Sequence, residues 1–150
     1  MTDPTAIAQR LYDAFAARDG EALLAAMTED FVGTVSAGMP LGVGGRHEGR
    51  DAMLRDVWAQ VFIAYDMAVE ADRYLVCAPD EVVVLGSYRG SERATGDPVD
   101  ARFAHVLTLR DGHVASLEQI TDTRSWAGHR VTADPTRSAS STPKNVETQK

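Results

Sequence analysis

Three polar residues in the last third of the chain, His105, Gln119 and Asp122, are of types that could do chemistry in an apolar setting. His105 alternates with Phe103 and Leu107, so in a strand its imidazole shares their face. An imidazole titrates near neutral pH and can act as a general base. A core histidine that is satisfied by a backbone carbonyl group is the alternative interpretation.

Gln119 and Asp122 belong to a predicted neighbouring strand. Gln119 has the parity of Leu117 and Thr121, which we expect to face inward and to contact a ligand. Its amide can orient a carbonyl group or a water molecule but cannot exchange a proton. Asp122 has the opposite parity and reaches the same site only if the strand bulges. Otherwise Asp122 caps the turn that leads to Trp126.

Aromatic side chains recur on the segments that must surround these polar groups. Predicted helices carry Tyr12, Phe15, Trp58 and Phe62, and a predicted strand carries Tyr88. We expect these five residues to line a ligand site, where Tyr88 could present its hydroxyl group. Each could instead be ordinary core, because aromatic residues at helical spacing usually are.

The sequence offers little for a metal ion or a cofactor. His47 and Glu48 are adjacent, but such a pair without further ligands makes a poor metal site. The glycines within residues 42–45 are not followed by the Lys-Ser/Thr of a phosphate-binding loop, and no nucleotide fingerprint occurs. We therefore expect neither a metal ion nor a cofactor.

Three helices are predicted in the N-terminal half. Asp3 and Pro4 start the first, whose apolar residues repeat at helical spacing until Gly20. A shorter helix includes Met27, and Asp51 can cap the third. The apolar positions of the third helix form a wide stripe: Met53, Leu54, Val57, Trp58, Val61 and Phe62.

Strands make up most of the remainder. Residues 31–36 favour a short strand and the glycine-rich residues 38–49 favour a loop. Four strands follow, centred on 67–72, 81–89, 101–110 and 113–122, and Asp111-Gly112 predicts a hairpin between the last two. The sequence thus predicts one α+β domain over residues 1–128. Residues 129–150, rich in Ser, Thr and Pro, are predicted to be a disordered tail.

Composition argues against several classes of partner. The 150 residues carry a formal net charge of −7 and no Lys/Arg cluster, so we expect no nucleic acid. No apolar run approaches the roughly 20 residues that span a bilayer, and the N-terminus lacks a signal-peptide pattern. Cys77 is the single cysteine, which is compatible with a reducing compartment. We expect a cytoplasmic protein with no membrane partner.

Four segments carry a family resemblance: residues 8–19 (AQRLYDAFAARD), 27–31 (MTEDF), 49–53 (GRDAM) and 103–123, which contains FAHV, DGHV and QITDT. They resemble the nuclear transport factor 2-like superfamily, in its SnoaL-like, ketosteroid-isomerase-related branch. The resemblance implies a cone-shaped, curved antiparallel sheet wrapped around three helices, a cystatin-like α+β barrel. It also implies a small hydrophobic molecule in the cone and a homodimer through the open sheet face.

Known catalytic residues of two characterised members are missing at the corresponding positions. The tyrosine and the two acids of ketosteroid isomerase correspond to Leu11, Ala104 and Val35. Tyr12 is one residue out of step, which amounts to roughly 100° of helix rotation. The Arg-x-Asp of limonene epoxide hydrolase falls on residues 86–88 (GSY), which hold neither charged group.

SnoaL-type cyclases leave one partial match. Their strand histidine corresponds to His105, while Gln119 stands where they place an aspartate. We expect a cofactor-independent isomerase, cyclase or hydrolase of a small hydrophobic metabolite, with His105 as base, Gln119 orienting the substrate and Asp122 assisting. The alternative is a non-catalytic ligand-binding or dimerisation module of the same fold.

Overall fold

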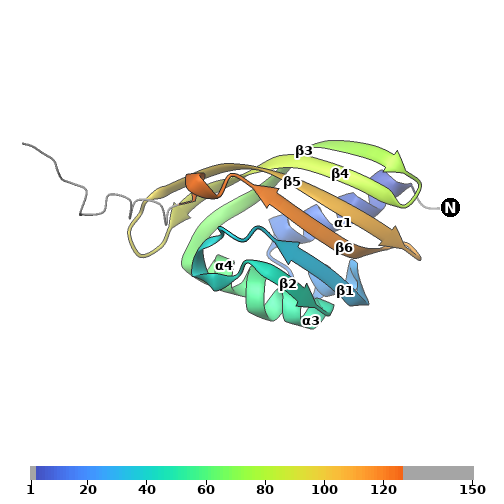
Figure 1. Cartoon of the computed structure of the whole chain (residues 1–150), viewed down its shortest axis with the longest axis horizontal. Coiled ribbons are helices and arrows are strands. Elements are labelled where there is room, and N and C mark those ends of the chain that lie inside the picture. Colours follow the sequence, from blue (N-terminus) through green and yellow to red (C-terminus); the bar gives the residue numbers. More distant parts are fainter. Residues whose placement is uncertain (1–2, 127–150) are drawn as a thin grey trace, which may run out of the picture.

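The computed structural model describes residues 3–126, which form a six-stranded sheet curved over the helices (Figure 1). The strands are β1 (Met27–Val35), β2 (Gly45–Glu48), β3 (Tyr65–Ala78), β4 (Glu81–Glu92), β5 (Pro98–Arg110) and β6 (His113–Thr121). Their order is β2-β1-β6-β5-β4-β3. The predicted α+β class and curved sheet are confirmed. The sheet stays open, however, and β1 and β6 pair in parallel, so it is not wholly antiparallel.

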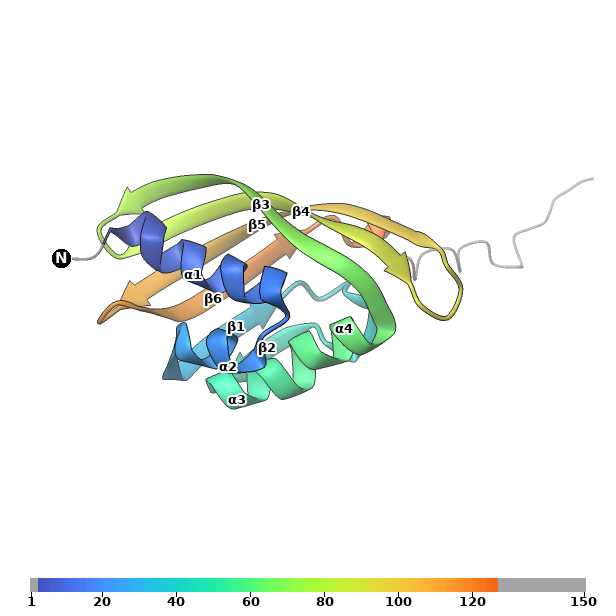
Figure 2. The ribbon, with the colours of Figure 1, turned by 180° about the vertical axis from the view of Figure 1, so that it is seen from behind.

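The helices lie on the concave side of the sheet, α1 across its upper part and α3 and α4 below (Figure 2). They are α1 (Pro4–Ala17), α2 (Gly20–Ala25), α3 (Arg50–Met53) and α4 (Ala59–Ala64). The predicted start of α1 is confirmed, because the carboxylate of Asp3 accepts a hydrogen bond from the backbone N–H of Thr5 at 3.1 Å. Arg18, with φ of 54°, ends it.

The third predicted helix is continuous from α3 to α4, joined by a π-helical turn over Leu54–Trp58. It begins after Gly49, whose φ of 95° suits glycine, and no side chain caps it. The prediction that Asp51 is the cap is therefore wrong. π turns often occur at functional sites, and this one ends at Trp58.

Two predictions between residues 26 and 49 are also wrong. Met27 begins β1 instead of belonging to the second helix, because it pairs with Val114, whose N–H donates to the carbonyl group of Ala26 at 2.9 Å. Strand β2 was not predicted. Its residues, GRHE, lack apolar alternation, and pairing with β1 alone makes them a strand.

The C-terminal hairpin is confirmed: Asp111 and Gly112 adopt φ of 53° and 77°. After β6, a single 3₁₀ turn over Thr123–Ser125 leads to Trp126, the last residue described. The predicted tail, residues 129–150, lies outside the described residues. Within residues 3–126, no helix is long and apolar enough to cross a membrane.

Strands β4, β5 and β6 position the polar residues by simple alternation. Phe103, His105 and Leu107 of β5 are buried on the concave face, as predicted, and Ala104 and Val106 point to the convex face. A β-carbon at Gly86 of β4 would collide with the ring of Phe103. Glycine there lets the phenyl ring lie flat against the imidazole of His105, with ring centres 4.0 Å apart.

Candidate functional site

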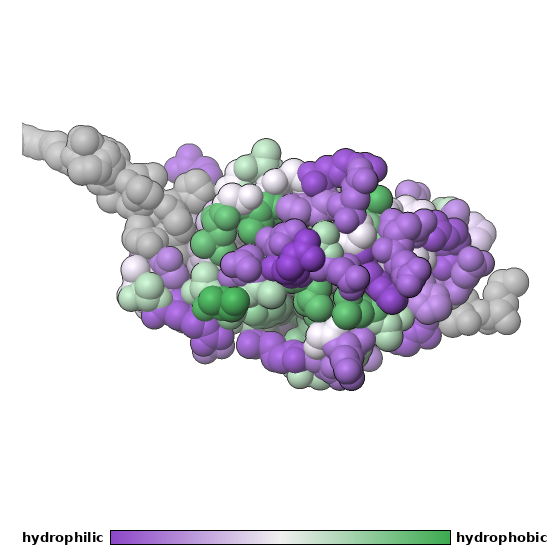
Figure 3. All heavy atoms as spheres, turned by 90° about the horizontal axis from the view of Figure 1, so that it is seen from below, coloured by the Kyte–Doolittle hydropathy of each residue, from purple (hydrophilic) through white to green (hydrophobic). Residues whose placement is uncertain are grey.

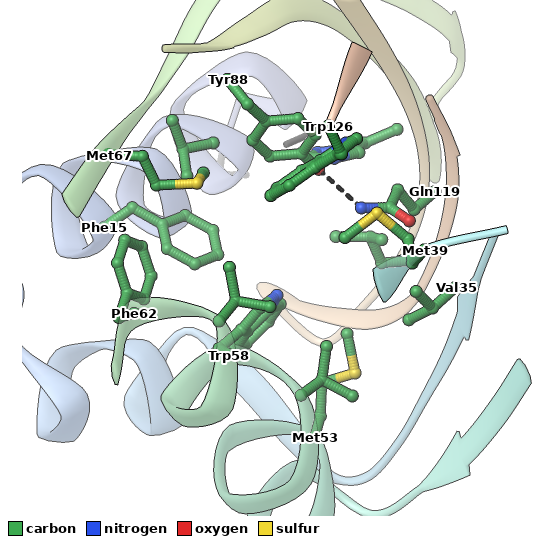
Figure 4. Close-up of a pocket in the computed structure, with 15 residues that line it drawn as sticks. Phe15, Val35, Met39, Met53, Trp58, Phe62, Met67, Tyr88, Gln119 and Trp126 are labelled. Carbon is green, nitrogen blue, oxygen red and sulfur yellow. Dashed lines mark hydrogen bonds between the residues drawn. The ribbon is translucent and has the colours of Figure 1, made fainter. Parts of the chain in front are cut away.

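A pocket opens between the concave face of the sheet and the helix that runs from α3 to α4 (Figure 4). Predicted ligand-site residues that line it are Phe15, Trp58, Phe62, Tyr88 and Leu117, together with His105 and Gln119. Among the described residues that line it, none is an aspartate or a glutamate. The wall is therefore apolar and aromatic, with a small polar region at one side.

The pocket is narrow in this structure. The space open to the centres of water molecules is about 30 Å³, which holds on the order of two waters. Met39, Met53 and Met67 contribute to the wall, and methionine side chains adapt readily because they are unbranched and flexible. A ligand that contains a ring must displace some of these side chains.

His105 lies between two tyrosines at the polar side of the pocket. Its Nδ1 is 2.7 Å from the hydroxyl oxygen of Tyr12, and its Nε2 is 2.6 Å from that of Tyr88. All three side chains are buried. Both imidazole nitrogens are thus engaged within the protein.

Gln119 extends this chain of hydrogen bonds. Its Oε1 accepts from the backbone N–H of Ser36 at 3.1 Å, and its Nε2 donates to the hydroxyl oxygen of Tyr88 at 2.9 Å, drawn as a dashed line in Figure 4. A backbone N–H can only donate, so the amide oxygen must face Ser36 and the NH₂ group must face Tyr88. Tyr88 is therefore an acceptor in this contact.

Burial keeps these groups uncharged. It lowers the pKa of His105 to about 3, and it raises the pKa of both Tyr12 and Tyr88 above the usual value for tyrosine. At neutral pH the site consists of a neutral imidazole between two hydroxyl groups. The expectation that His105 is the general base is not met in this geometry, because neither ring nitrogen is free to take a proton from a substrate.

Tyr12 corrects the alignment used above. The sequence suggested two places for Tyr12, the wall of a ligand site or, by the alignment, a position turned off the inward face. Tyr12 is 5% exposed and its hydroxyl group contacts His105. Ala104, aligned with a catalytic acid, instead points to the convex face beside Ile120. The polar side chains inside the fold are thus Tyr12 and His105, each one residue beyond an aligned position. Tyr12 does not line the pocket itself and contacts it through His105.

Asp122 and Thr121 stand away from the pocket. Asp122 is exposed and accepts hydrogen bonds from the N–H of Arg124 and from the hydroxyl group of Ser125, at 3.2 and 2.7 Å. This is the capping role that was its alternative interpretation. The hydroxyl group of Thr121 donates to the carbonyl group of Arg102 at 2.8 Å, which contradicts its expected place at the ligand.

Several lining residues were not predicted from the sequence. They are Val35, Met39, Met53, Val57, Val61, Met67, Val69 and Trp126. Val69 and Met67 had the right parity on their strand but gave no further signal. Trp126 follows the 3₁₀ turn after β6, and only the fold shows that this turn returns to the pocket.

The described residues include no group of three or more His, Cys, Asp or Glu side chains placed to hold a metal ion. In the adjacent pair considered above, the imidazole Nε2 of His47 bonds the carbonyl oxygen of Val43 at 2.8 Å. Glu48 is exposed and pairs with Arg46. Both side chains therefore contact neighbouring residues of the same segment.

Solved structures with this architecture include proteins of moderate sequence similarity. An NTF2-like protein from Burkholderia thailandensis is 29% identical, with a TM-score of 0.76, over 83% of this chain and 95% of that one. TerC, co-crystallised with polyporic acid, is 28% identical, with a TM-score of 0.73, over 87% and 98%. A protein proposed to be a polyketide cyclase, from Sinorhizobium meliloti, is 26% identical, with a TM-score of 0.62, over 79% and 100%.

No protein of curated function matches the sequence. The family model of the SnoaL-like domain matches residues 8–117. This range includes the helices, β1 to β5 and most of the pocket wall. The chain therefore belongs to the SnoaL-like domain family.

Proposed function

We propose that this protein binds a small hydrophobic metabolite in its cone and acts as a cofactor-independent cyclase that polarises an oxygen of the bound molecule through the hydroxyl group of Tyr88. TerC, with its polyporic acid, and the protein proposed to be a polyketide cyclase support a small-molecule role for relatives of this chain. The observation that carries the proposal is the fixed position of Tyr88 between His105 and Gln119 at the pocket wall.

Hydrogen-bond counting assigns the hydrogen atoms. If Nδ1 of His105 carried the hydrogen, the Tyr12 hydroxyl group would accept it, and its own hydrogen would be buried without an acceptor among the described residues. If Nε2 carries it, Tyr12 donates to Nδ1 and is satisfied. In either form one tyrosine hydroxyl hydrogen has no acceptor among these groups. The Nε2–H form is favoured because that hydrogen then belongs to Tyr88 at the pocket wall, where water or a ligand can accept it, and not to Tyr12, which does not line the pocket.

The Nε2–H form directs Tyr88 toward the ligand. Its oxygen then accepts from both the imidazole of His105 and the amide of Gln119. Its own hydrogen has no acceptor among these partners and is available to the pocket that Tyr88 lines. The two incoming donors also polarise the hydroxyl group, which makes it a stronger donor.

Such a donor can stabilise negative charge as it develops on a carbonyl oxygen. The raised pKa of Tyr88 keeps its proton in place, so it remains a hydrogen-bond donor at neutral pH. The described lining residues supply no carboxylate base. Among isomerisation, cyclisation and hydrolysis, this favours an aldol-type cyclisation of a substrate that is already enolised. The enol carbon bonds to the carbonyl carbon as its C=O π bond breaks, the enol oxygen becomes a carbonyl oxygen, and the enol proton passes to the new alkoxide oxygen. No net proton is removed, so the step needs no carboxylate base.

A non-catalytic ligand-binding module is the second candidate. The absence of a carboxylate among the described lining residues and the engagement of both His105 nitrogens favour it. In that case Tyr88 would hold the ligand without turning it over. Mass spectrometry of a candidate ligand before and after incubation with the protein separates the two, because only a cyclase changes its structure.

Binding itself can be followed by fluorescence, because both tryptophans of the chain, Trp58 and Trp126, line the pocket. We expect saturable quenching by polyporic acid or by acetophenone, and about tenfold weaker binding of the same compound by Tyr88→Phe. Tyr74→Phe, on the neighbouring β3, is the matched control and should bind as the wild type does. Equal affinity of the Tyr88→Phe and Tyr74→Phe variants would contradict the role of Tyr88.

We also propose that two copies associate through the convex face of the sheet. Adjacent strands there carry an outer apolar patch: Leu75, Val83, Leu85, Ala104, Val106 and Ile120. Ile120 is 53% exposed and Leu75 is 38% exposed. On the helical side of the molecule, hydrophobic residues lie in separate patches among hydrophilic ones (Figure 3). A contiguous apolar sheet face favours burial against a second copy.

A further inference from the structure

The indole N–H of Trp126 is an unused hydrogen-bond donor in the pocket wall. Trp126 is 2% exposed and lines the pocket. Its Nε1 is buried and has no hydrogen-bond partner in the part of the chain that the structure describes. An indole nitrogen can only donate, and buried polar groups are normally satisfied, so this donor calls for an acceptor that residues 3–126 do not supply.

The position of Trp126 is fixed by its surroundings. Asp122 caps the turn before it, and a β-carbon on Gly38 would press against the side chain of Thr123, so the turn lies close on the loop that follows β1. The indole packs against two aromatic rings, 5.3 Å from Tyr65 and 5.0 Å from Tyr88 between ring centres. The orphan donor is thus part of a packed wall.

Trp126 and Tyr88 lie side by side at the polar side of the pocket, next to Gln119 (Figure 4). With the His105 tautomer assigned above, Tyr88 also has a hydrogen that lacks a protein acceptor. Two donors of different chemical type, both on residues that line one small apolar pocket, therefore lack an acceptor among the described residues. The side-chain acceptors beside them already take part in hydrogen bonds: Oε1 of Gln119 accepts from the N–H of Ser36, and both nitrogens of His105 are bonded to tyrosines.

We infer that Trp126 is a specificity-determining residue, whose indole N–H joins the hydroxyl group of Tyr88 in binding a ligand oxygen that accepts but does not donate hydrogen bonds. The site then selects a ketone or quinone over the corresponding alcohol. A carbonyl oxygen satisfies both donors, whereas the hydrogen of an alcohol would be buried with no free acceptor beside it. This inference rests on the proposed small-molecule function and adds the chemistry of the molecule.

Three probes of nearly the same shape test it: acetophenone, 1-phenylethanol and ethylbenzene. We expect the protein to bind the ketone about tenfold more tightly than the alcohol. Trp126→Phe keeps an aromatic ring but removes the donor, so it should weaken acetophenone binding about fivefold to tenfold more than it weakens ethylbenzene binding. Trp58→Phe, which changes the other tryptophan of the pocket, should not alter the ratio of ketone to hydrocarbon affinity.

A direct reading on the unaltered protein does not depend on how well the variants fold. In a ¹H–¹⁵N spectrum, the indole proton of Trp126, assigned with Trp126→Phe or by sequential NMR assignment, should move downfield with acetophenone and not with ethylbenzene. If all three probes bind and neither this shift nor the variant shows a ketone preference, the inference is overturned while small-molecule binding stands. The inference would also be overturned if the indole proton were shifted upfield in both the free and the bound state, because it would then point at the face of the Tyr65 ring and not at the ligand. If none of the probes binds, the proposed function fails as well.

Discussion

The concave and convex faces of β4, β5 and β6 are built from alternating residues of the same three strands, yet their side chains meet different needs. On the concave face, His105, Tyr88 and Gln119 are held by one another within hydrogen-bond distance. On the convex face, Val106 and Ile120 have neither a polar role nor full cover. The difference fits the two proposals above, a ligand on the concave face and a second copy of the chain on the convex face.

The largest loss of stability should come from replacing His105, the centre of the buried series of hydrogen bonds. His105→Leu leaves the hydroxyl groups of Tyr12 and Tyr88 without their shared partner, so we expect the free energy of unfolding to fall by about 3 kcal/mol. Chemical denaturation measures it. The triple variant with Tyr12→Phe and Tyr88→Phe should recover much of the loss, because it removes the stranded groups as well. A loss no larger than that of His113→Leu, at an exposed turn, would contradict this account.

The contribution of His105 to stability should also be measurable in the wild-type protein as the pH is lowered. The folded state keeps His105 neutral with a pKa of about 3, whereas an unfolded histidine titrates near 6.5. Below pH 6.5 the unfolded state therefore binds one more proton, and stability falls with decreasing pH by about 1.4 kcal/mol per unit. Denaturation curves between pH 6.5 and 4.5 measure this slope.

The window avoids the main carboxylate contributions. Hydrogen bonds from Arg110 and Arg55 hold the pKa of Asp30 and of Asp56 below the usual value, so their loss of stability comes at still lower pH. In the His105→Gln variant, the pH dependence of the free energy of unfolding between pH 6.5 and 4.5 should fall by about 1.4 kcal/mol per pH unit, which corresponds to one proton. An unchanged slope would show that His105 is already protonated, or that it titrates normally, in the folded state.

The convex face is tested by placing a charge on it. Ile120→Arg puts a guanidinium group in the outer apolar patch, so the dimer should dissociate about 100-fold more readily. Ile63→Arg is the matched control, because Ile63 is 69% exposed on α4, away from this patch. Light scattering at micromolar concentration measures both. A wild-type monomer under these conditions would refute the proposed association.

The smallest effect separates the two tyrosines. Tyr12→Phe leaves Nδ1 of His105 without a donor and should cost about 1 kcal/mol of stability. Because Tyr12 does not line the pocket, acetophenone affinity should stay within about twofold of the wild type. Tyr88→Phe should cost similar stability and also lose affinity. If Tyr12→Phe weakened binding as much as Tyr88→Phe, the two hydroxyl groups would not have separate roles.

The sequence predicted the class of fold and the parity of the site strands because alternation depends only on neighbouring residues. Phe103, His105 and Leu107 face inward as expected. It failed for β2, where the pattern is set by pairing with β1, and for Met27, whose strand depends on Val114 far along the chain. Tertiary pairing overrides local preference at such places.

The residues of the site could be predicted better than the hydrogen bonds between them. His105, Tyr88 and Gln119 were expected at the pocket, and all three line it. Their roles depend on partners that no spacing reveals, since Tyr12 is 93 residues from His105 and Ser36 is 83 from Gln119. For Asp122 the sequence left two roles open, in the site or as a cap. The 3₁₀ turn that it caps forms only at the end of β6.

The protonation state of His105 tests the central claim most directly. A long-range ¹H–¹⁵N correlation spectrum of the imidazole distinguishes a protonated ring nitrogen from an unprotonated one. At pH 7 we expect Nε2 to carry the hydrogen and Nδ1 to be bare, which directs the hydroxyl hydrogen of Tyr88 into the pocket. A hydrogen on Nδ1, or on both nitrogens, would contradict the account, since Tyr88 would then donate to His105 or face a charged ring.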